Sequence, residues 1–291
     1  MIYQILNVVA PTFIVVFIGW IWGKAGYKYD NNLVTSLIMN IGGPCLVFST
    51  LGDLEVSVSL IGRMGLATLI AISIFGLVGA MFLKWAGLSS SSFLSPLMFP
   101  NIGNIGLPIC LFAYGKTGLA LAVMVFAVFC LFQFTVGIKL YSGGSSLMSL
   151  FKEPIIYAVI ASLFFIINRS RPPDILQRTT ELLGAFTIPL MLLSLGVTLA
   201  KLRVISIKRS FLLALLRVAM GFVVSLGLSY VFRFDHDARG VFVLQCSMPV
   251  AVFNYMLAER YHRSPVENAE LLMVSTLLSL VTLPLILRFL L

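Results

Sequence analysis

The chain has 291 residues, of which 59% are hydrophobic and only 11% are charged, whereas about a quarter of the residues in soluble domains are charged. Its mean hydropathy is +1.04, and a single soluble core could not bury so much apolar surface. This composition excludes a soluble globular protein and predicts an integral membrane protein whose partner is the lipid bilayer. The net charge of +9 is scattered between apolar runs, which is typical of membrane-helix flanks, so we expect no nucleic-acid binding.

Apolar segments long enough to cross a bilayer, about 20 residues each, follow one another along the whole chain. In chain order, the ten expected spans are 4–23, 33–52, 64–83, 93–115, 117–138, 154–168, 182–200, 210–232, 240–258 and 270–288. The linker "YSGGSSLMSLFKEP" is the only flexible-looking connection, and it lies at the middle of the chain. We therefore expect an all-α membrane protein made of residues 1–141, a central linker at 142–153, and residues 154–291.

The basic residues between the spans predict the orientation of the chain. With the N-terminus outside, eleven Lys and Arg residues fall on the inside and eight on the outside, which favours both termini outside. The cluster "KLRVISIKR" after the seventh span contributes most to this bias. The start "MIYQILNVVAPTF" lacks the basic n-region of a signal peptide, so we interpret it as the first span.

The two halves of the chain show signs of an internal repeat. A shift of 145 residues superimposes Pro44 on Pro189, Ser49 on Ser194 and Ala113 on Ala258. The same shift brings "GGPCLVFSTLG" of span two to "TIPLMLLSLG" of span seven, and "NIGNIGLPICLFAYG" of span four to "SMPVAVFNYMLAERY" of span nine. Because five spans is an odd number, the second half enters the membrane from the opposite side. Inverted repeats with broken helices at matching places are typical of transporters.

Helix-breaking and polar residues interrupt the fourth span. They are Pro100, Asn101, Gly103, Asn104, Gly106 and Pro108. Backbone groups freed by such residues find no water in hydrocarbon, so the break must be buried in protein or line a wet cavity. We expect two half-helices that meet inside the membrane, with amide side chains and backbone N–H groups directed at a ligand. Pro249 and Asn254 predict a similar break in the ninth span, although an ordinary proline kink is the alternative there.

Other candidate residues allow two interpretations each. Arg217 is the only charged residue well inside a span, and it either meets an anion in a polar cavity or snorkels to the interface. Asp53, with Glu55, follows span two as either a proton or cation site near a gate or part of a solvated loop. Pro44 and Pro189 either kink supporting helices or approach the substrate.

Catalytic and metal-binding patterns are not found in the sequence. No Asp, Glu or His is expected well inside a span, and no phosphate-binding P-loop motif occurs. The four cysteines have no metal-ligand spacing; they are Cys45, Cys110, Cys130 and Cys246. We therefore expect neither enzymatic activity nor a cofactor or metal.

The strings "PNIGNIGLPICLFAYG" and "SMPVAVFNYMLAERY" resemble the auxin efflux carrier family, which includes plant auxin exporters and bacterial permeases described for malate or malonate. The Asn-x-Gly-Asn-x-Gly-Leu-Pro run at 101–108 is the more specific match. The resemblance covers essentially the entire chain, and the short central linker is of the bacterial kind. It implies a location in a bacterial inner membrane.

The resemblance also implies two inverted five-helix repeats, with spans four and nine crossing at their breaks. A scaffold domain and a transport domain would then move against each other in an elevator-like cycle. The substrate would be an organic anion. The substrate-binding role is carried onto Asn101, Gly103, Asn104, Gly106, Pro108, Pro249, Ala251 and Asn254.

We thus expect a secondary carrier of small carboxylates such as malate, malonate or auxin-like acids. Two alternatives remain. One is a sodium-coupled symporter of larger amphipathic anions, because the bile acid/sodium symporter group shares the implied architecture. The other is a channel-like or receptor-type membrane protein. Proton or sodium coupling, the direction of transport and a homodimeric state are left open by the sequence.

Overall fold

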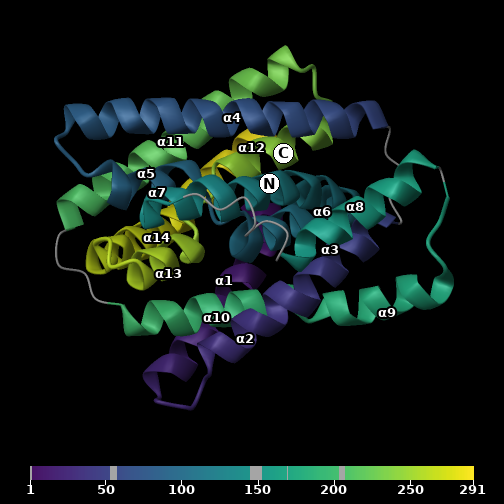
Figure 1. Ribbon diagram of the computed structural model, residues 1–291, viewed down its shortest axis with the longest axis horizontal. Coiled ribbons are helices and arrows are strands. Elements are labelled where there is room, and N and C mark those ends of the chain that lie inside the picture. Colours follow the sequence, from purple (N-terminus) through teal and green to yellow (C-terminus); the bar gives the residue numbers. More distant parts are fainter. Residues whose placement is uncertain (1, 53–57, 145–152, 169, 203–206) are drawn as a thin grey trace.

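The computed structural model describes residues 2–52, 58–144, 153–168, 170–202 and 207–291, and these fold almost entirely into helices (Figure 1). The helices of the first half are α1 (Ile2–Lys24), α2 (Asn31–Leu37), η1 (Ile38–Gly42), α3 (Gly43–Gly52), α4 (Val58–Trp85), α5 (Ser90–Met98), η2 (Ile102–Gly106), α6 (Leu107–Phe132), η3 (Gln133–Gly137) and α7 (Ile138–Ser142). Those of the second half are α8 (Pro154–Ile167), α9 (Asp174–Ala185), α10 (Thr187–Lys201), α11 (Ile207–Val231), α12 (His236–Cys246), α13 (Val252–Arg260) and α14 (Pro265–Leu290). The predicted all-helical class is confirmed for these residues.

Within these described ranges, seven helical stretches are long and apolar enough to cross a membrane. They are Ile5–Lys24, Asn31–Leu51, Ser59–Trp85, Ile102–Ser142, Asp174–Lys201, Ile207–Val231 and Pro265–Leu290. The helix Pro154–Ile167 is apolar but shorter. The multi-pass character of the chain agrees with the prediction, whereas the predicted number of ten spans is not confirmed by this measure.

One source of the difference is a reversal of the chain inside α6. Gly115 has φ +64° and ψ −155°, a conformation that only glycine adopts without strain. A Cβ placed on Gly118 would collide with the Cβ of Tyr114 and would lie 2.7 Å from the carbonyl oxygen of Cys110. In a straight helix residues 110 and 118 would be about 12 Å apart along the axis. The segments before and after Gly115 are therefore two arms of a hairpin.

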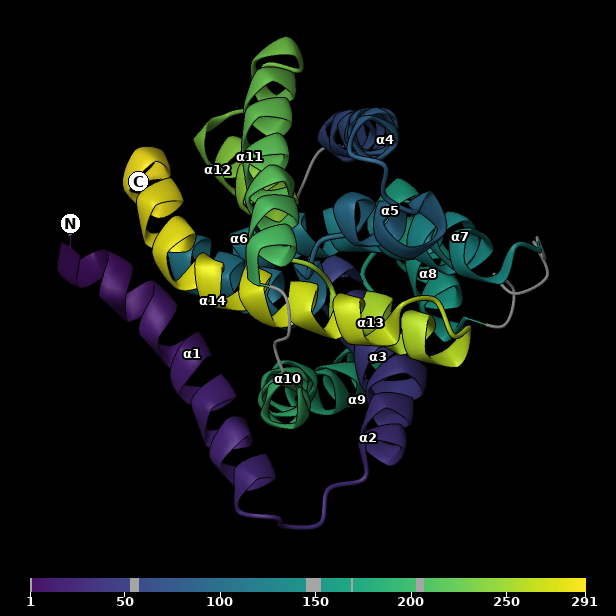
Figure 2. The same cartoon turned by 90° about the vertical axis from the view of Figure 1, so that its left-hand side faces the viewer.

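Helices that are distant in sequence pack side by side. Helix α1 lies along α10, α3 contacts α8 and α9, α6 contacts α12, and α11 contacts both α4 and α14. Figure 2 shows α4 and α10 nearly end-on at opposite sides of the molecule, with the yellow α14 between them. The helices thus form two groups. The first contains α1–α3 and α8–α10, and the second contains α4–α7 and α11–α14.

Glycines permit the closest of these contacts. A Cβ on Gly196 of α10 would collide with the carbonyl oxygen of Val16, and one on Gly19 of α1 would collide with that of Leu193. Such small residues let helix backbones approach closely in membranes, where van der Waals packing drives association. The α1–α10 pair therefore depends on its glycines.

The prolines of spans two and seven lie next to changes of helix. Pro44 is the second residue of α3, directly after the π-helical η1. Pro189 lies in the first turn of α10, after the interruption at Phe186 that separates it from α9. A Cβ on Gly42 would collide with the Oγ1 atom of Thr187, so the two spans cross in close contact at these positions.

Replacing Gly196 by Ala is expected to lower the apparent melting temperature of the purified protein, because overpacking of a close contact costs about 1–3 kcal/mol. The matched control is Gly62→Ala in α4, where an added Cβ would meet no atom within 4 Å. Differential scanning fluorimetry in detergent measures both variants. Equal melting temperatures for the two variants would contradict the close packing of α1 on α10.

Candidate functional site

Two extended segments meet at the centre of the protein. Helix α5 ends at Met98 and α12 ends at Cys246, and residues 99–101 and 248–251 follow them without helical structure. Pro100 and Val250 form an antiparallel β-bridge. The Asn101 N–H donates to the carbonyl of Pro249 at 2.6 Å, and the Ala251 N–H donates to the carbonyl of Phe99 at 3.3 Å. We call these two paired segments the crossing. Each donates one bond and accepts one, so the backbone groups freed by the two interruptions satisfy each other.

Asn254 braces the crossing from the side of α13. Its Nδ2 group donates to the carbonyl of Phe99 at 3.1 Å, and its Oδ1 atom accepts from the Ser95 hydroxyl at 2.8 Å. The side chain is fully buried. A further brace comes from α14, where the Ser275 hydroxyl accepts the Val250 N–H at 3.1 Å. Asn254 is thus occupied in holding the backbone.

Asn101 and Asn104 lie on the other side of the crossing. The Oδ1 atom of Asn101 accepts the Asn104 N–H at 3.3 Å and caps η2. The Nδ2 group of Asn101 is buried without a hydrogen-bond partner. The amide side chain of Asn104 is partly exposed and has no hydrogen bond to another residue that the structure describes. Both side chains therefore keep amide donors free.

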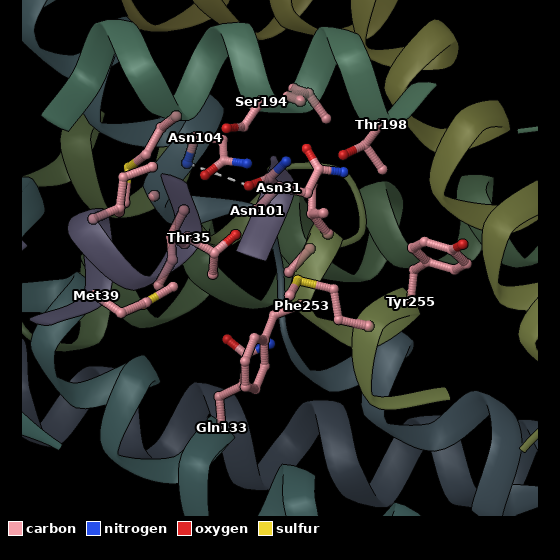
Figure 3. A pocket seen from close by; sticks show the side chains of 18 of the residues that line it. Asn31, Thr35, Met39, Asn101, Asn104, Gln133, Ser194, Thr198, Phe253 and Tyr255 are labelled. Atoms are coloured by element: carbon pink, nitrogen blue, oxygen red, sulfur yellow. Dashed lines mark hydrogen bonds between the residues drawn. The ribbon is translucent and has the colours of Figure 1, made fainter. Parts of the chain in front are cut away.

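A cavity of about 310 Å³ lies against this side of the crossing. That volume is within the range of about 300–1,000 Å³ that is usual for small-molecule sites. Its polar lining residues are Asn31, Asn32, Thr35, Asn101, Asn104, Gln133, Ser194, Thr198, Lys201, Tyr255 and Glu259. In Figure 3 side chains from α2, α10, α13, the crossing and η3 surround a common space. The cavity thus lies between the two groups of helices.

All three π-helical segments among the described residues border this cavity. Ile38 and Met39 come from η1, residues 102–104 from η2, and Gln133 and Phe134 from η3. A π-helical turn accommodates one extra residue and shifts the side chains that follow, and such turns are frequent at functional sites. The cavity is therefore lined where the helices depart from regular geometry.

The polar side chains near the crossing end of the cavity are neutral amides with free donors. The Nε2 group of Gln133, like Nδ2 of Asn101, is buried without a partner in the described part of the chain. Both residues line the cavity. Lys201 and Glu259 are exposed and lie where α10 and α13 end. The inner end of the cavity is thus suited to a group that accepts hydrogen bonds.

The loop between α1 and α2 is tied to the cavity wall. The hydroxyl groups of Tyr29 and Ser194 lie 2.5 Å apart. Burial raises the pKa of the Tyr29 hydroxyl, which therefore stays protonated at neutral pH. This bond holds the loop against α10, one of the helices that line the cavity.

The structure separates the predicted site residues into two sets. Asn101, Gly103, Asn104 and Ala251 line the cavity. The others, Gly106, Pro108, Pro249 and Asn254, are not among the lining residues. Pro249 and Asn254 hold the crossing through their hydrogen bonds. Gly106 packs against α12, because a Cβ there would collide with the side chain of Gln245. Asp53 and Glu55 lie outside the described residues.

Arg217 is in neither of the two environments considered from the sequence. It is fully buried in α11, so it does not snorkel, and it does not line the cavity. Its Nη2 group donates to the carbonyl of Cys246 at 2.6 Å.

Several lining residues were not identified from the sequence, above all Gln133, Ser194, Thr198 and Tyr255. Gln133, Ser194 and Thr198 come from spans for which no break was expected, and Ser and Thr hydroxyls in a helix usually bond to the preceding turn. Tyr255 follows the expected break at Pro249, but its residue type gave no signal of a site. The one available signal was Gln133, an amide within the otherwise apolar span 117–138. No group of three or more His, Cys, Asp and Glu side chains in the described ranges is arranged to hold a metal ion.

Comparisons with known proteins agree with a transport role. A family model described as membrane transport protein matches residues 139–287. An uncharacterized transporter of Methanothermobacter thermautotrophicus is 25% identical over 290 residues, which cover 95% of each chain. An uncharacterized transporter of Methanocaldococcus jannaschii is 23% identical over 299 residues, which cover 96% of this chain and 97% of the relative. Both relatives come from archaea, and they do not place this chain in a bacterial membrane. The chain belongs to the membrane transport protein family, that of the auxin efflux carriers.

Proposed function

We propose that the protein is a secondary transporter that binds a small organic anion in the cavity beside the crossing. The observation that carries this proposal is the set of amide groups of Asn101, Asn104 and Gln133, which have donors free of partners in the described chain. A carboxylate offers only acceptors, with about four lone-pair sites on its two oxygens. It would satisfy these donors, whereas a ligand rich in donors would leave them unpaired.

The charged residues around the cavity also favour an anionic ligand. Glu259 is the only carboxylate among the described lining residues, and it lies at the exposed end of the cavity opposite Lys201. Neutral amide donors bind an anion without the desolvation cost of burying a fixed charge beside it. The substrate class that fits is a small carboxylate of the malate, malonate or auxin-like kind.

The transport cycle that we propose uses two inverted repeats, residues 1–141 and 154–291. The reciprocal backbone bonds of the crossing support a local two-fold relation between the broken helices α5–α6 and α12–α13. Gly42 and Thr187, which correspond under the shift of 145 residues, also lie in contact. Because the cavity lies between the two helix groups, a movement of one group against the other would carry the site across the membrane, as in an elevator.

We further propose that the structure represents an inward-facing state. The cavity extends from the crossing to the start of α2 and to the ends of α10 and α13. Lys201 and Arg260 end α10 and α13, and Lys24 ends α1 before the loop to α2. The charge bias predicts this side to be the inside.

Replacing Asn104 by Ala is expected to reduce the uptake of radiolabelled malonate and malate into proteoliposomes. Loss of a hydrogen bond to a charged group costs about 1.5–3 kcal/mol, which corresponds to roughly ten- to hundredfold weaker binding. The matched control is Asn40→Ala, since Asn40 is exposed and does not line the cavity. A melting curve shows that both variants are folded. Unchanged transport by the Asn104 variant would overturn the site assignment.

The cavity is also expected to be filled with water. In a background in which the four native cysteines are replaced by Ala, Asn104→Cys and Thr198→Cys should react with a soluble maleimide. The control Thr68→Cys should stay unmodified, because Thr68 is fully buried in α4. Mass spectrometry of the intact protein measures the extent of reaction. Protection of both cavity cysteines, or equal labelling of residue 68, would contradict a wet cavity at the crossing.

A further inference from the structure

Arg217 is a fully buried cation whose surroundings are not those of an ion pair. No carboxylate lies within ion-pair distance of it among the residues that the structure describes. Its guanidinium contacts the Cys246 carbonyl at 2.6 Å and lies over the Phe75 ring, 4.6 Å from the ring centroid. A buried charge without such compensation is strongly unfavourable. The contact with the end of α12 must therefore account for the position of this side chain.

Without Arg217, one backbone carbonyl at the end of α12 would have no hydrogen-bond donor. The last four carbonyls of a helix have no partner within the helix. The Ser247 N–H donates to the carbonyls of Val243 at 3.0 Å and Leu244 at 3.1 Å, and the Met248 N–H donates to that of Gln245 at 3.4 Å. Backbone N–H groups of the following residues thus donate to three of the four carbonyls. The fourth belongs to the last helical residue, and it is the one that accepts the guanidinium bond.

Helix α11 is shaped for this contact at two positions one turn apart. Gly221 follows Arg217 by four residues and therefore lies on the same face of the helix. A Cβ on Gly221 would collide with the Cys246 carbonyl oxygen and would lie 3.0 Å from the Cα of Ser247. The absent side chain lets α11 approach the end of α12, and the guanidinium then reaches the carbonyl. One residue provides the space and the other provides the donor.

The electrostatics of this contact are favourable on both sides. The carbonyl end of a helix carries a partial negative charge, which a cation stabilises, and the effect is larger where solvent does not screen it. Here the end of α12 is buried with the chain at the crossing. The end of α12 supplies partial negative charge that no carboxylate in the described chain provides, and Arg217 neutralises a helix end that is buried.

The first half of the chain has no equivalent cation. Under the shift of 145 residues, Gly221 corresponds to Gly76 and Arg217 to Ile72, both in α4. Gly76 also faces the end of a broken helix, because a Cβ there would lie 3.1 Å from the Cε atom of Met98. The space provided by the glycine is thus present in both halves, whereas the charged donor is present in one.

The two helix ends are capped in different ways. The carbonyl of Phe99 after α5 accepts from the Asn254 side chain and the Ala251 N–H, which both belong to the second half. The carbonyl of Cys246 accepts from Arg217, which belongs to the same half. The end of α12 therefore depends on a donor from α11, a helix of the same half.

We propose that Arg217 is a positioning residue for the crossing. By holding the last carbonyl of α12, it sets where the chain leaves the helix and so places residues 248–251 against residues 99–101. It acts through the backbone of Cys246, since its side chain does not line the cavity. Its relevance to transport rests on the proposed function, whereas its test requires no ligand.

Hydrogen–deuterium exchange of the purified protein in detergent, without added ligand, tests this role. In Arg217→Met, amides of residues 99–102 and 247–252 are expected to exchange at least about tenfold faster than in the unmodified protein, because local opening there is no longer opposed by the cap. Amides of α1 and α10 should be unchanged. Arg217→Lys keeps a charged donor and should restore exchange at the crossing to within about threefold.

A second pair of variants leaves the charge in place. Gly221→Ala should accelerate exchange at the same residues, because the added methyl group separates α11 from the end of α12. Gly227→Ala lies on the same helix, where an added Cβ meets no atom within 4 Å, and should change nothing.

Unchanged exchange at the crossing in Arg217→Met would overturn the proposal. So would equal acceleration in all helices, which would indicate a general loss of stability. If Arg217→Met does not fold, the glycine pair decides the question, and identical exchange in Gly221→Ala and Gly227→Ala then overturns the proposal. A negative result in these exchange measurements would not change the interpretation of the uptake experiment on Asn104.

Discussion

Backbone amides and carbonyls cannot stay unpaired in the lipid bilayer, and this constraint shapes the centre of the protein. Two interrupted helices, α5–α6 and α12–α13, expose such groups at the same place. They meet the constraint by pairing with each other through the bonds between residues 99–101 and 249–251. Asn254, Ser275 and Arg217 complete the arrangement by serving carbonyls or amides that the pairing leaves over. The crossing is therefore a small polar structure enclosed in an apolar protein.

The pairing also decides which groups remain available for a ligand. Because the backbone satisfies itself on one side, the amide side chains of Asn101 and Asn104 are left on the other side, where the cavity lies. Gln133 adds a third amide from η3. We propose that this site binds an anion through neutral donors, which would suit a carrier that must also release its substrate. The membrane transport family of the chain supports a transport role and does not name the substrate.

The position of the break could be predicted from sequence because proline, glycine and asparagine within one apolar span have few physical explanations. The same reasoning could not distinguish Asn104, which faces the cavity, from Asn254, which holds the Phe99 carbonyl. That difference arises from tertiary contacts, as does the role of Gln133, whose span looks like an ordinary membrane helix. The sequence predicted a boundary between spans 93–115 and 117–138, next to Gly115, where the chain reverses within one continuous helical stretch. The sequence identified Arg217 as the only charged residue well inside an expected span. Its partner is a backbone carbonyl, which no pattern of side chains in the sequence predicts.

We propose that the crossing presents amide donors to a carboxylate. Ligand-induced thermal stabilisation of the unmodified protein tests it most directly, with mono- and dicarboxylates compared against neutral amides of the same size, such as malonate against malonamide. Binding to the native state stabilises it by about 2.7 kcal/mol at a ligand concentration one hundred times Kd. The melting temperature is expected to rise with the concentration of at least one carboxylate and not to change with its amide. Equal stabilisation by the acid and the amide, or no stabilisation by any carboxylate, would contradict this proposal.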